Sequence, residues 1–279
     1  MSTSRLLENY DVVEPMIRKL YDSKQRLAIL EALSGGPKQL SDLWREVGAN
    51  APNTSTRAKD LEEMSLIRRD KGEYRLTRWG EAVLKGMDDS LEFYSAYWKF
   101  RELWDNHIKA GIPEHLWADI GALNNSVLIK NDSLDYVKVH EVFLKFFGTA
   151  KTRFYAVAPI FNKDWLLAVE NLARNGVDTR LILKTDVIVK GYQAATDSFK
   201  EVIELDNLKL YEIKEARVAF AVTDSALDIS LPEKEGAVSY MDMCLESDDP
   251  RAVQWGRRLF DYYKSKAKPL DLESIIGSP

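Results

Sequence analysis

The chain has 279 residues, of which 45% are hydrophobic and 30% charged, a composition typical of an ordinary folded protein with room for two domains. No apolar run approaches the ~20 residues needed to cross a bilayer, and the N-terminus lacks the apolar core of a signal peptide. A single cysteine, Cys244, excludes an intrachain disulfide and a multi-cysteine metal site. We therefore expect a cytoplasmic protein with no membrane partner.

The net charge of −5 is unevenly distributed along the chain. Residues 1–80 carry 14 Lys and Arg against 12 Asp and Glu, a net charge of +2, whereas the remainder carries 25 against 32, a net charge of −7. Because salt screens electrostatic fields beyond about 8–10 Å, an acidic distal region does not prevent a basic region from meeting phosphates. The overall acidity therefore leaves a nucleic-acid partner open.

Residues 23–48 are expected to form two short helices. In Arg26–Leu33 the leucines recur at helical spacing on one face, with Ser23 as N-cap and Gly35 at the end. In Leu40–Val47 the apolar residues fall at i, i+3, i+4 and i+7, and Gly48 ends the helix. Both patterns predict helices that bury one side against a small core.

A third helix is predicted from Thr54 to Met64, after a turn rich in small polar residues. It would bury Ala58, Leu61 and Met64. The polar side chains on its outer face are Ser55, Thr56, Arg57 and Lys59.

A basic hairpin follows the third helix. Two strand-like runs, 66–69 and 74–76, are joined through a tight turn at Lys71-Gly72, and Thr77 caps the next helix. The basic residues of the hairpin are Arg68, Arg69, Lys71 and Arg75. Three helices and a basic ribbon are typical of a winged helix-turn-helix, in which one helix enters the major groove of double-stranded DNA and the hairpin lies on phosphates. Two alternatives stay open: an unrelated small α+β domain, and a winged helix that binds only protein.

Residues 81–111 are predicted to be a linker, most of it a long helix from Gly80 to Lys109 with Gly86 as a candidate interruption. Its aromatic and apolar residues form two adjacent stripes, one of Phe93, Tyr97, Phe100 and Trp104, the other of Leu91, Tyr94 and Trp98. Packing within one domain and a dimer helix both account for these stripes. We favour a homodimer, because helix-turn-helix proteins commonly read two half-sites by two-fold symmetry.

From residue 112 to 279 strands and helices alternate, which predicts a mixed α/β sheet covered on both faces. The predicted strands lie at 127–129, 152–158, 177–183, 208–212, 218–223 and 226–231. The predicted helices lie at 134–147, 164–174, 199–205 and 251–264.

The sequence offers little for catalysis. The three histidines, His107, His115 and His140, show no metal spacing and lie far from Cys244 in sequence. No glycine-rich phosphate loop follows a strand, and no G-x-S-x-G elbow is present. We expect no catalytic residue, no metal and no cofactor.

The chain resembles, over nearly its full length, archaeal winged-helix transcriptional regulators of the methanogen regulatory type. The stretches that carry the resemblance are Gly111–Leu116 with His115, Val157–Phe161, Gly176–Leu183, Ala219–Asp224 and Trp255–Tyr263. The resemblance implies a DNA-binding domain at 1–80, a linker or dimerisation helix at 81–111 and a regulatory domain at 112–279. It also implies that this last domain is a non-enzymatic effector sensor with an α/β, phospholipase-D-like fold.

The phospholipase D signature is His-x-Lys, then four intervening residues, then Asp. With its Asp placed on Asp224, Arg217 stands where the His would be and Ala219 where the Lys would be. Because the histidine forms the covalent intermediate, the sequence predicts a catalytically degenerate domain. A phosphodiesterase is the alternative that this substitution disfavours.

An effector site is expected beyond the carboxyl ends of the strands, where α/β sheets bind ligands. The candidates are Lys184 and Arg217 for an anionic small molecule, with Tyr155 and Phe161 as apolar walls. Each of the four is also explained as an ordinary surface or core residue.

Overall fold

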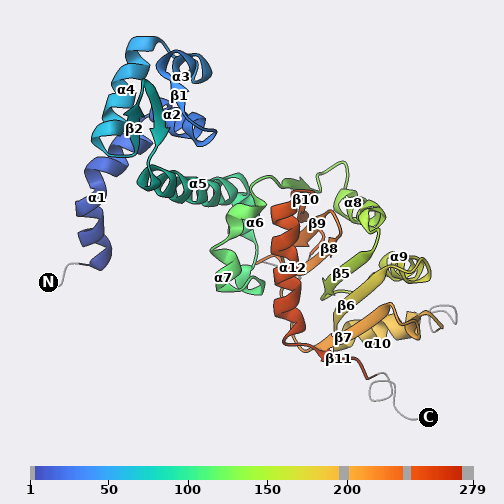
Figure 1. Ribbon diagram of the computed structural model, residues 1–279. Helices are drawn as coiled ribbons and strands as arrows, with labels where there is room; N and C mark the ends of the chain where they lie inside the picture. Colours follow the sequence, from blue (N-terminus) through green and yellow to red (C-terminus); the bar gives the residue numbers. More distant parts are fainter. Residues whose placement is uncertain (1–3, 195–200, 235–239, 272–279) are drawn as a thin grey trace. The chain divides into compact units, whose positions relative to one another are not determined.

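The computed structural model describes residues 4–194, 201–234 and 240–271, and it divides into two compact units, Met1–Leu91 and Glu92–Pro279 (Figure 1). The division falls inside helix α5 (Arg78–Lys99), between the predicted boundaries at residues 80 and 111. Among the described residues, no helix combines the length and the apolar character needed to span a membrane.

The N-terminal unit packs helices against a small sheet. Its elements before α5 are α1 (Arg5–Tyr21), α2 (Lys24–Ser34), β1 (Lys38–Gln39), α3 (Leu40–Glu46), α4 (Ala51–Glu63), β2 (Ile67–Asp70) and β3 (Glu73–Leu76). Leu30, Leu43 and Leu61, one from each of the three predicted helices, are fully buried in its core. The two-residue strand β1 pairs with β3 and completes a three-stranded sheet of order β1-β3-β2, which was not predicted because two residues show no periodicity.

Local capping explains where these helices begin. The Ser23 side chain accepts a hydrogen bond from the Arg26 N–H at 3.3 Å, as predicted for α2. The predicted start of α4 at Thr54 is wrong by three residues. Asn50 caps the helix by accepting from the Asn53 N–H at 2.9 Å, and Pro52 is tolerated because the first turn needs no internal donor there.

The hairpin and the cap after it are confirmed. Lys71 and Gly72 both have positive φ, at 50° and 90°, which is the conformation of a two-residue turn matched to strand twist. The Thr77 hydroxyl donates to the Ser65 carbonyl at 2.7 Å and accepts from the Gly80 N–H at 2.9 Å. Gly80 lies so close to the backbone of β2 that an added Cβ would stand 1.9 Å from the carbonyl oxygen of Leu66.

The long helix is interrupted at Phe100 rather than at Gly86. Gly86 lies inside α5, whereas Phe100 leaves helical geometry and precedes α6 (Arg101–Asn106). Phe100 and Trp104 are both buried, and the Trp104 indole N–H donates across the break to the Ala96 carbonyl at 3.3 Å. Burial of these two rings, a tertiary effect, therefore decides where the helix ends.

The described part of the C-terminal unit is built on a mixed sheet, as predicted; it has eight strands rather than the six predicted, because β10 and β11 were not foreseen, and its order is β11-β7-β6-β5-β8-β9-β10-β4. Its strands are β4 (Val127–Lys130), β5 (Arg153–Ala158), β6 (Asp178–Lys184), β7 (Leu208–Ile213), β8 (Ala219–Thr223), β9 (Leu227–Ser230), β10 (Met243–Ser247) and β11 (Lys268–Pro269). Strands β5, β6 and β7 are parallel, and the other pairs are antiparallel.

In the described part of this unit, α6 is followed by the helices α7 (Glu114–Trp117), α8 (Lys138–Phe146), α9 (Lys163–Arg174), α10 (Thr185–Ala194) and α12 (Pro250–Lys264), with short 3-10 turns at Lys109–Gly111, Ile120–Leu123 and Phe147–Thr149. The predicted helix at 134–147 begins four residues late, because the Asp132 side chain accepts the N–H groups of Leu134 and Asp135 and holds them in a turn. Of the predicted helix at 199–205, residues 201–203 are helical, and residues 199 and 200 lie outside the described part.

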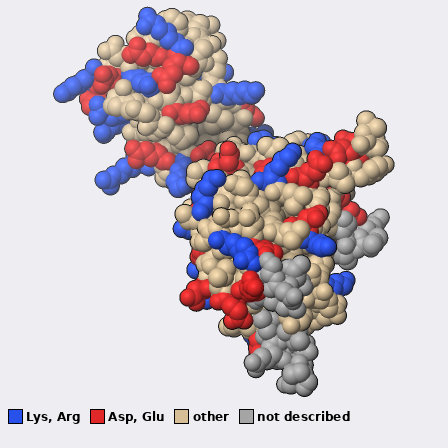
Figure 2. Space-filling model, turned by 90° about the vertical axis from the view of Figure 1, so that its right-hand side faces the viewer, with Lys and Arg blue, Asp and Glu red and all other residues tan. Residues whose placement is uncertain are grey.

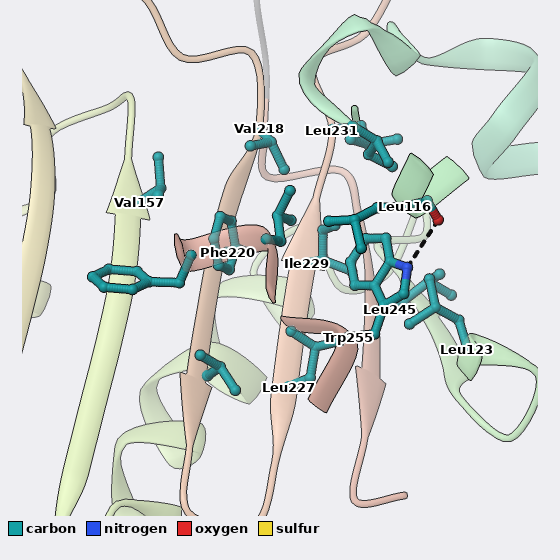
Figure 3. Packing of buried hydrophobic residues seen from close by; sticks show 14 of the residues in the cluster. Leu116, Leu123, Val157, Val218, Phe220, Leu227, Ile229, Leu231, Leu245 and Trp255 are labelled. Carbon is teal, nitrogen blue, oxygen red and sulfur yellow. Dashed lines mark hydrogen bonds between the residues drawn. The ribbon is translucent and has the colours of Figure 1, made fainter. Parts of the chain in front are cut away.

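Two separate hydrophobic clusters cover the two faces of the sheet. Helix α12 packs on one face, whereas α8, α9 and α10 lie on the other (Figure 1). Beneath α12, Trp255 is buried among residues of β8, β9 and β10, and its indole N–H donates to the Leu116 carbonyl at 3.0 Å (Figure 3). Successive side chains along each strand therefore point alternately into the two hydrophobic clusters.

Candidate functional site

Helix α4 presents the polar face that the sequence predicted. Ser55, Thr56 and Lys59 are exposed, and Arg57 is half-buried. Beside this face lies a partly buried ion pair, in which the Arg26 guanidinium reaches Asp60 at 2.5 Å and also donates to the Lys19 carbonyl at 2.7 Å. The hydrogen bond from Arg26 lowers the pKa of Asp60, although burial opposes that shift. Asp60 also lies 3.5 Å from Arg57, so it links α4 to α2 and is the ion-pair partner of one residue of the polar face.

The hairpin places two arginines opposite each other. Arg68 on β2 and Arg75 on β3 are direct register partners, so both side chains stand on the same face of the ribbon. Like charges in such a pair are normally destabilising, and the nearest acid to Arg75 is Asp70 at 3.6 Å. Arg69 stands on the other face, with its guanidinium 5.4 Å from the centre of the Tyr74 ring. A pair of this kind is suited to an external anion.

Lys71 is exposed at the turn, beside the strands that carry the arginines. On the face in Figure 2, basic and acidic side chains occur side by side over the N-terminal unit. The hairpin is therefore distinguished from the rest of the unit by a local group of basic side chains, and not by an extended positively charged surface.

The four predicted ligand residues lie apart from one another. The Tyr155 hydroxyl donates to Asp178 at 2.6 Å, and its ring stacks on Phe260 of α12 at 4.9 Å. Arg217 donates to Glu215 at 2.6 Å, and Lys184 lies 3.4 Å from Asp186. Phe161, in contrast, lines a cavity beneath α8, α9 and α10. The structure thus does not bring the four side chains into one site.

Asp224, the one position of the phospholipase D signature retained in the sequence, caps the start of β5. Its carboxylate accepts from the N–H groups of Lys151, Thr152 and Arg153, at 2.8, 2.7 and 3.2 Å, and from the Thr152 hydroxyl. Burial would raise the pKa of Asp224, but these hydrogen bonds outweigh it and hold that pKa well below its usual range. The side chain is fully engaged in holding the backbone.

Each histidine has a local contact. His107 is buried, with Nδ1 at 2.9 Å from the Leu103 carbonyl and Nε2 at 3.0 Å from Asp242. Burial lowers the pKa of His107, but the Asp242 carboxylate, the Leu103 carbonyl and the charge of Glu233 together outweigh burial and raise that pKa. His140 lies 3.2 Å from Asp164, and His115 packs on Tyr262. Within the described ranges no group of three His, Cys, Asp or Glu residues has the geometry of a metal site.

Two residues that the sequence did not single out are prominent in the cavity: Asp228 of β9 and Trp165 of α9. Their polar atoms, Asp228 Oδ2 and Trp165 Nε1, are buried and have no hydrogen-bond partner among the residues that the structure describes. The run Leu227–Ser230 alternates apolar and polar residues, which is typical of a strand with one solvated face. The sequence alone would therefore place Asp228 on the surface, because the alternation does not show which elements pack over the strand.

Comparison with known proteins shows a likeness to archaeal regulatory proteins. Residues 137–266 match the family described as the middle domain of the methanogenesis regulatory protein FilR1, and residues 15–96 match the HVO_A0261 N-terminal domain. The resemblance to methanogen-type archaeal regulators, predicted from the sequence, is confirmed.

One similar protein is the methanogenesis regulatory protein FilR1 of Methanothrix harundinacea, which is 24% identical to this chain over 277 residues. The match covers 95% of this chain, which spans about 60% of the length of that relative. Two solved structures are also similar. They are TrmBL2, an archaeal chromatin protein (TM-score 0.41, 15% identity, 92% of this chain and 99% of that one), and Nuc, a phospholipase D family member from Salmonella typhimurium (TM-score 0.41, 10% identity, 52% and 98%).

Proposed function

We propose that the chain is a DNA-binding transcriptional regulator, with a winged helix in the N-terminal unit and a non-enzymatic sensor in the C-terminal unit. The observation that carries the DNA-binding role is the Arg68–Arg75 pair, two cations held side by side on a hairpin that follows the exposed polar helix α4. The kinship with a methanogenesis regulatory protein supports the regulatory role.

In this proposal α4 enters the major groove of double-stranded DNA. Ser55, Thr56, Arg57 and Lys59 then face base edges, where hydroxyl and cationic donors read sequence. Arg68, Arg69, Lys71 and Arg75 contact phosphates, which adds affinity without reading sequence. The phosphates would also relieve the repulsion between Arg68 and Arg75.

The test measures the binding of the full chain to DNA from its own promoter region as a function of salt. The double variant Arg68→Gln/Arg75→Gln should lower the slope of log affinity against log salt by about two units, because each phosphate contact contributes about one. The matched control is Arg18→Gln/Lys85→Gln, which removes two cations of α1 and α5 that are paired with acids of their own helices.

An unchanged salt slope in the Arg68→Gln/Arg75→Gln variant would contradict this assignment. Failure of the wild-type chain to retard any promoter fragment, together with specific capture of one protein partner, would favour a winged helix that binds protein. Equal losses in the variant and the control would show only a general charge effect.

We propose further that the regulator acts as a homodimer through the outer stripe of α5. Tyr94 and Trp98 are 62% and 66% exposed, and Leu91 lies on the same helical stripe. Exposed aromatic side chains of this size are typical of interfaces. Trp98→Glu should shift a dimer to monomer in sedimentation velocity, whereas Leu134→Glu, at a residue of the same unit that is also exposed, should not. A wild-type chain that sediments as a monomer at all concentrations would overturn this part.

The sensor is proposed to be non-enzymatic because the residues of the phospholipase D reaction are replaced or engaged. Arg217 and Ala219 stand at the positions of the nucleophile and the lysine, and Asp224 caps a strand. Turnover of a generic phosphodiester by the wild-type chain, abolished in Asp224→Ala without loss of folding, would revive the alternative of a phosphodiesterase.

A further inference from the structure

The C-terminal unit contains a cavity of about 120 Å³ between its sheet and the helices α8, α9 and α10. Aromatic and aliphatic side chains make up most of the lining, with Phe143 and Trp165 from the helices and Phe154 and Leu181 from the strands. Most of this lining belongs to the cluster on the face opposite α12, and Val157 and Phe220 of the cluster around Trp255 also line the cavity. An engineered apolar cavity of about 150 Å³ takes up benzene, so the space suits a ring-sized molecule.

Asp228 is an ionisable residue in a buried position, where an unpaired charge is strongly destabilising. It is only 3% exposed, it stands on the cavity side of β9, and its Oδ2 has no hydrogen-bond partner among the described residues. Burial raises the pKa of Asp228 to about 7, the Cys244 thiol lowers it by hydrogen bonding, and the charge of Glu246 raises it. Its unpaired oxygen is an acceptor held ready at the cavity wall.

Trp165 supplies a second unpaired group from a different wall. The Asn162 side chain caps α9 by accepting from the N–H groups of Asp164 and Trp165, at 2.8 and 3.3 Å, which fixes the first turn. The Trp165 ring packs against Phe143 at 4.9 Å and His140 at 6.4 Å. Despite these contacts its indole N–H is buried without an acceptor. Buried polar atoms without partners are rare, and two in one cavity point to a ligand.

The lining also limits the charge of the ligand. In the part of the chain that the structure describes, no Lys, Arg or His lines the cavity. An anion would therefore meet apolar walls and a carboxyl group, with no compensating charge. This differs from the anionic effector that the sequence suggested for Lys184 and Arg217, which do not line the cavity.

We propose that this cavity is the ligand site of the sensor, and that it takes a small, uncharged, ring-sized apolar molecule carrying a hydrogen-bond donor for Asp228 and an acceptor for Trp165. The site deepens the sensor role proposed above. Binding can nevertheless be measured on the full chain without DNA, so that the two proposals fail separately.

The test compares three probes of similar size on the full chain by calorimetry: phenol, toluene and benzoate. Phenol carries a donor and an acceptor, toluene carries neither, and benzoate adds a negative charge. Phenol and toluene should both bind, and benzoate should show no binding at concentrations that saturate phenol. The ratio of the phenol affinity to the toluene affinity reports on the polar groups and is insensitive to cavity shape.

Two variants remove one polar group each. Asp228→Leu and Trp165→Phe should each lower that ratio about tenfold, the loss expected for one hydrogen bond in a buried site. The control is Trp117→Phe, a matched change at a tryptophan that does not line the cavity. This control should keep the wild-type ratio.

Three results would overturn the proposal: no binding of phenol or toluene by the folded chain, an unchanged ratio in both Asp228→Leu and Trp165→Phe, or preferential binding of benzoate. If one variant does not fold, the ratio in the other decides. Probe binding in a chain that retards no DNA would keep the cavity site and reject the regulator. DNA binding without probe binding would keep the regulator and reject the cavity site.

Discussion

The two faces of the eight-stranded sheet differ in how they treat buried polar groups. Under α12 the tryptophan is satisfied, since Trp255 donates to the Leu116 carbonyl, and Tyr263 donates to the Gly111 carbonyl at 2.6 Å. Under α8, α9 and α10, Trp165 and Asp228 keep unpaired atoms around a cavity. The two aromatic donors under α12 are thus satisfied, whereas the other face holds a cavity with two unpaired polar atoms; among the described residues Arg257 Nε of α12 also has no partner.

The face under α12 thus serves mainly to stabilise the fold, whereas the face under α8, α9 and α10 holds the cavity proposed as a ligand site. Dense packing and satisfied donors on one face stabilise the fold. The unpaired groups on the other face lower stability, a cost that is typical of binding sites. Four predictions, given from the largest expected effect to the smallest, test whether the two faces differ in this way.

The largest effect is expected from removing the two tryptophans. Trp255→Ala should lower the free energy of unfolding by about 4–5 kcal/mol, because it leaves a cavity and an unpaired carbonyl. Trp165→Ala should lower it by about half as much, since that side chain is only partly buried and its N–H has no partner to lose. Urea denaturation of both variants measures the two losses. Equal losses of unfolding free energy in the two variants would contradict the difference between the two faces of the sheet.

The second prediction concerns the pH dependence of Asp228. Its pKa is about 7 in the folded chain, above the usual value, so the unfolded chain loses this proton first as pH rises. The contribution to stability is therefore complete below about pH 4 and is lost as pH rises through about 7. Asp228→Asn should gain about 2–4 kcal/mol over wild type at pH 8 and about nothing at pH 4. A difference between variant and wild type that does not change with pH would contradict the raised pKa.

The third prediction uses one glycine from each face. At Gly256 of α12 an added Cβ would stand 2.6 Å from Leu227 Cδ1, whereas at Gly191 of α10 it would stand 3.8 Å from the Phe161 ring. Gly256→Ala should destabilise by about 1–3 kcal/mol through overpacking. Gly191→Ala should stabilise by up to about 1 kcal/mol, since alanine is the better helix former and the space is open. Melting temperatures that move in the same direction would argue against a filled and a hollow face.

The smallest effect is expected for the carboxylate that supports the sheet, Asp224. Its pKa is held below the usual range by the hydrogen bonds at the start of β5, so its contribution is present above about pH 4 and is lost as pH falls. Asp224→Asn should cost about 1–2 kcal/mol at pH 7, after allowance for solvent screening, and less at pH 3. Asp224 and Asp228 should thus show opposite pH slopes in paired denaturation series.

Much of the fold was predictable, because short-range rules decide it. Ser23 and Thr77 cap helices through groups two or three residues away, and Lys71-Gly72 sets its own turn. The start of α4 was missed although its signal is local, an asparagine followed two residues later by proline. The break at Phe100 was not predictable in this way, since it depends on burial of Phe100 and Trp104 in the core of the C-terminal unit.

The sequence by itself determined the order of elements, the basic hairpin, the polar face of α4 and the loss of the phospholipase D residues, because these follow from neighbours along the chain. Only the tertiary structure decided that Tyr155 and Phe161 lie apart and that Asp228 is buried. Alternation in β9 shows which residues share a face, but not what covers it. That cover comes from α8 and α9, whose residues lie more than fifty positions away, and it turns a surface-like aspartate into the polar group of a cavity.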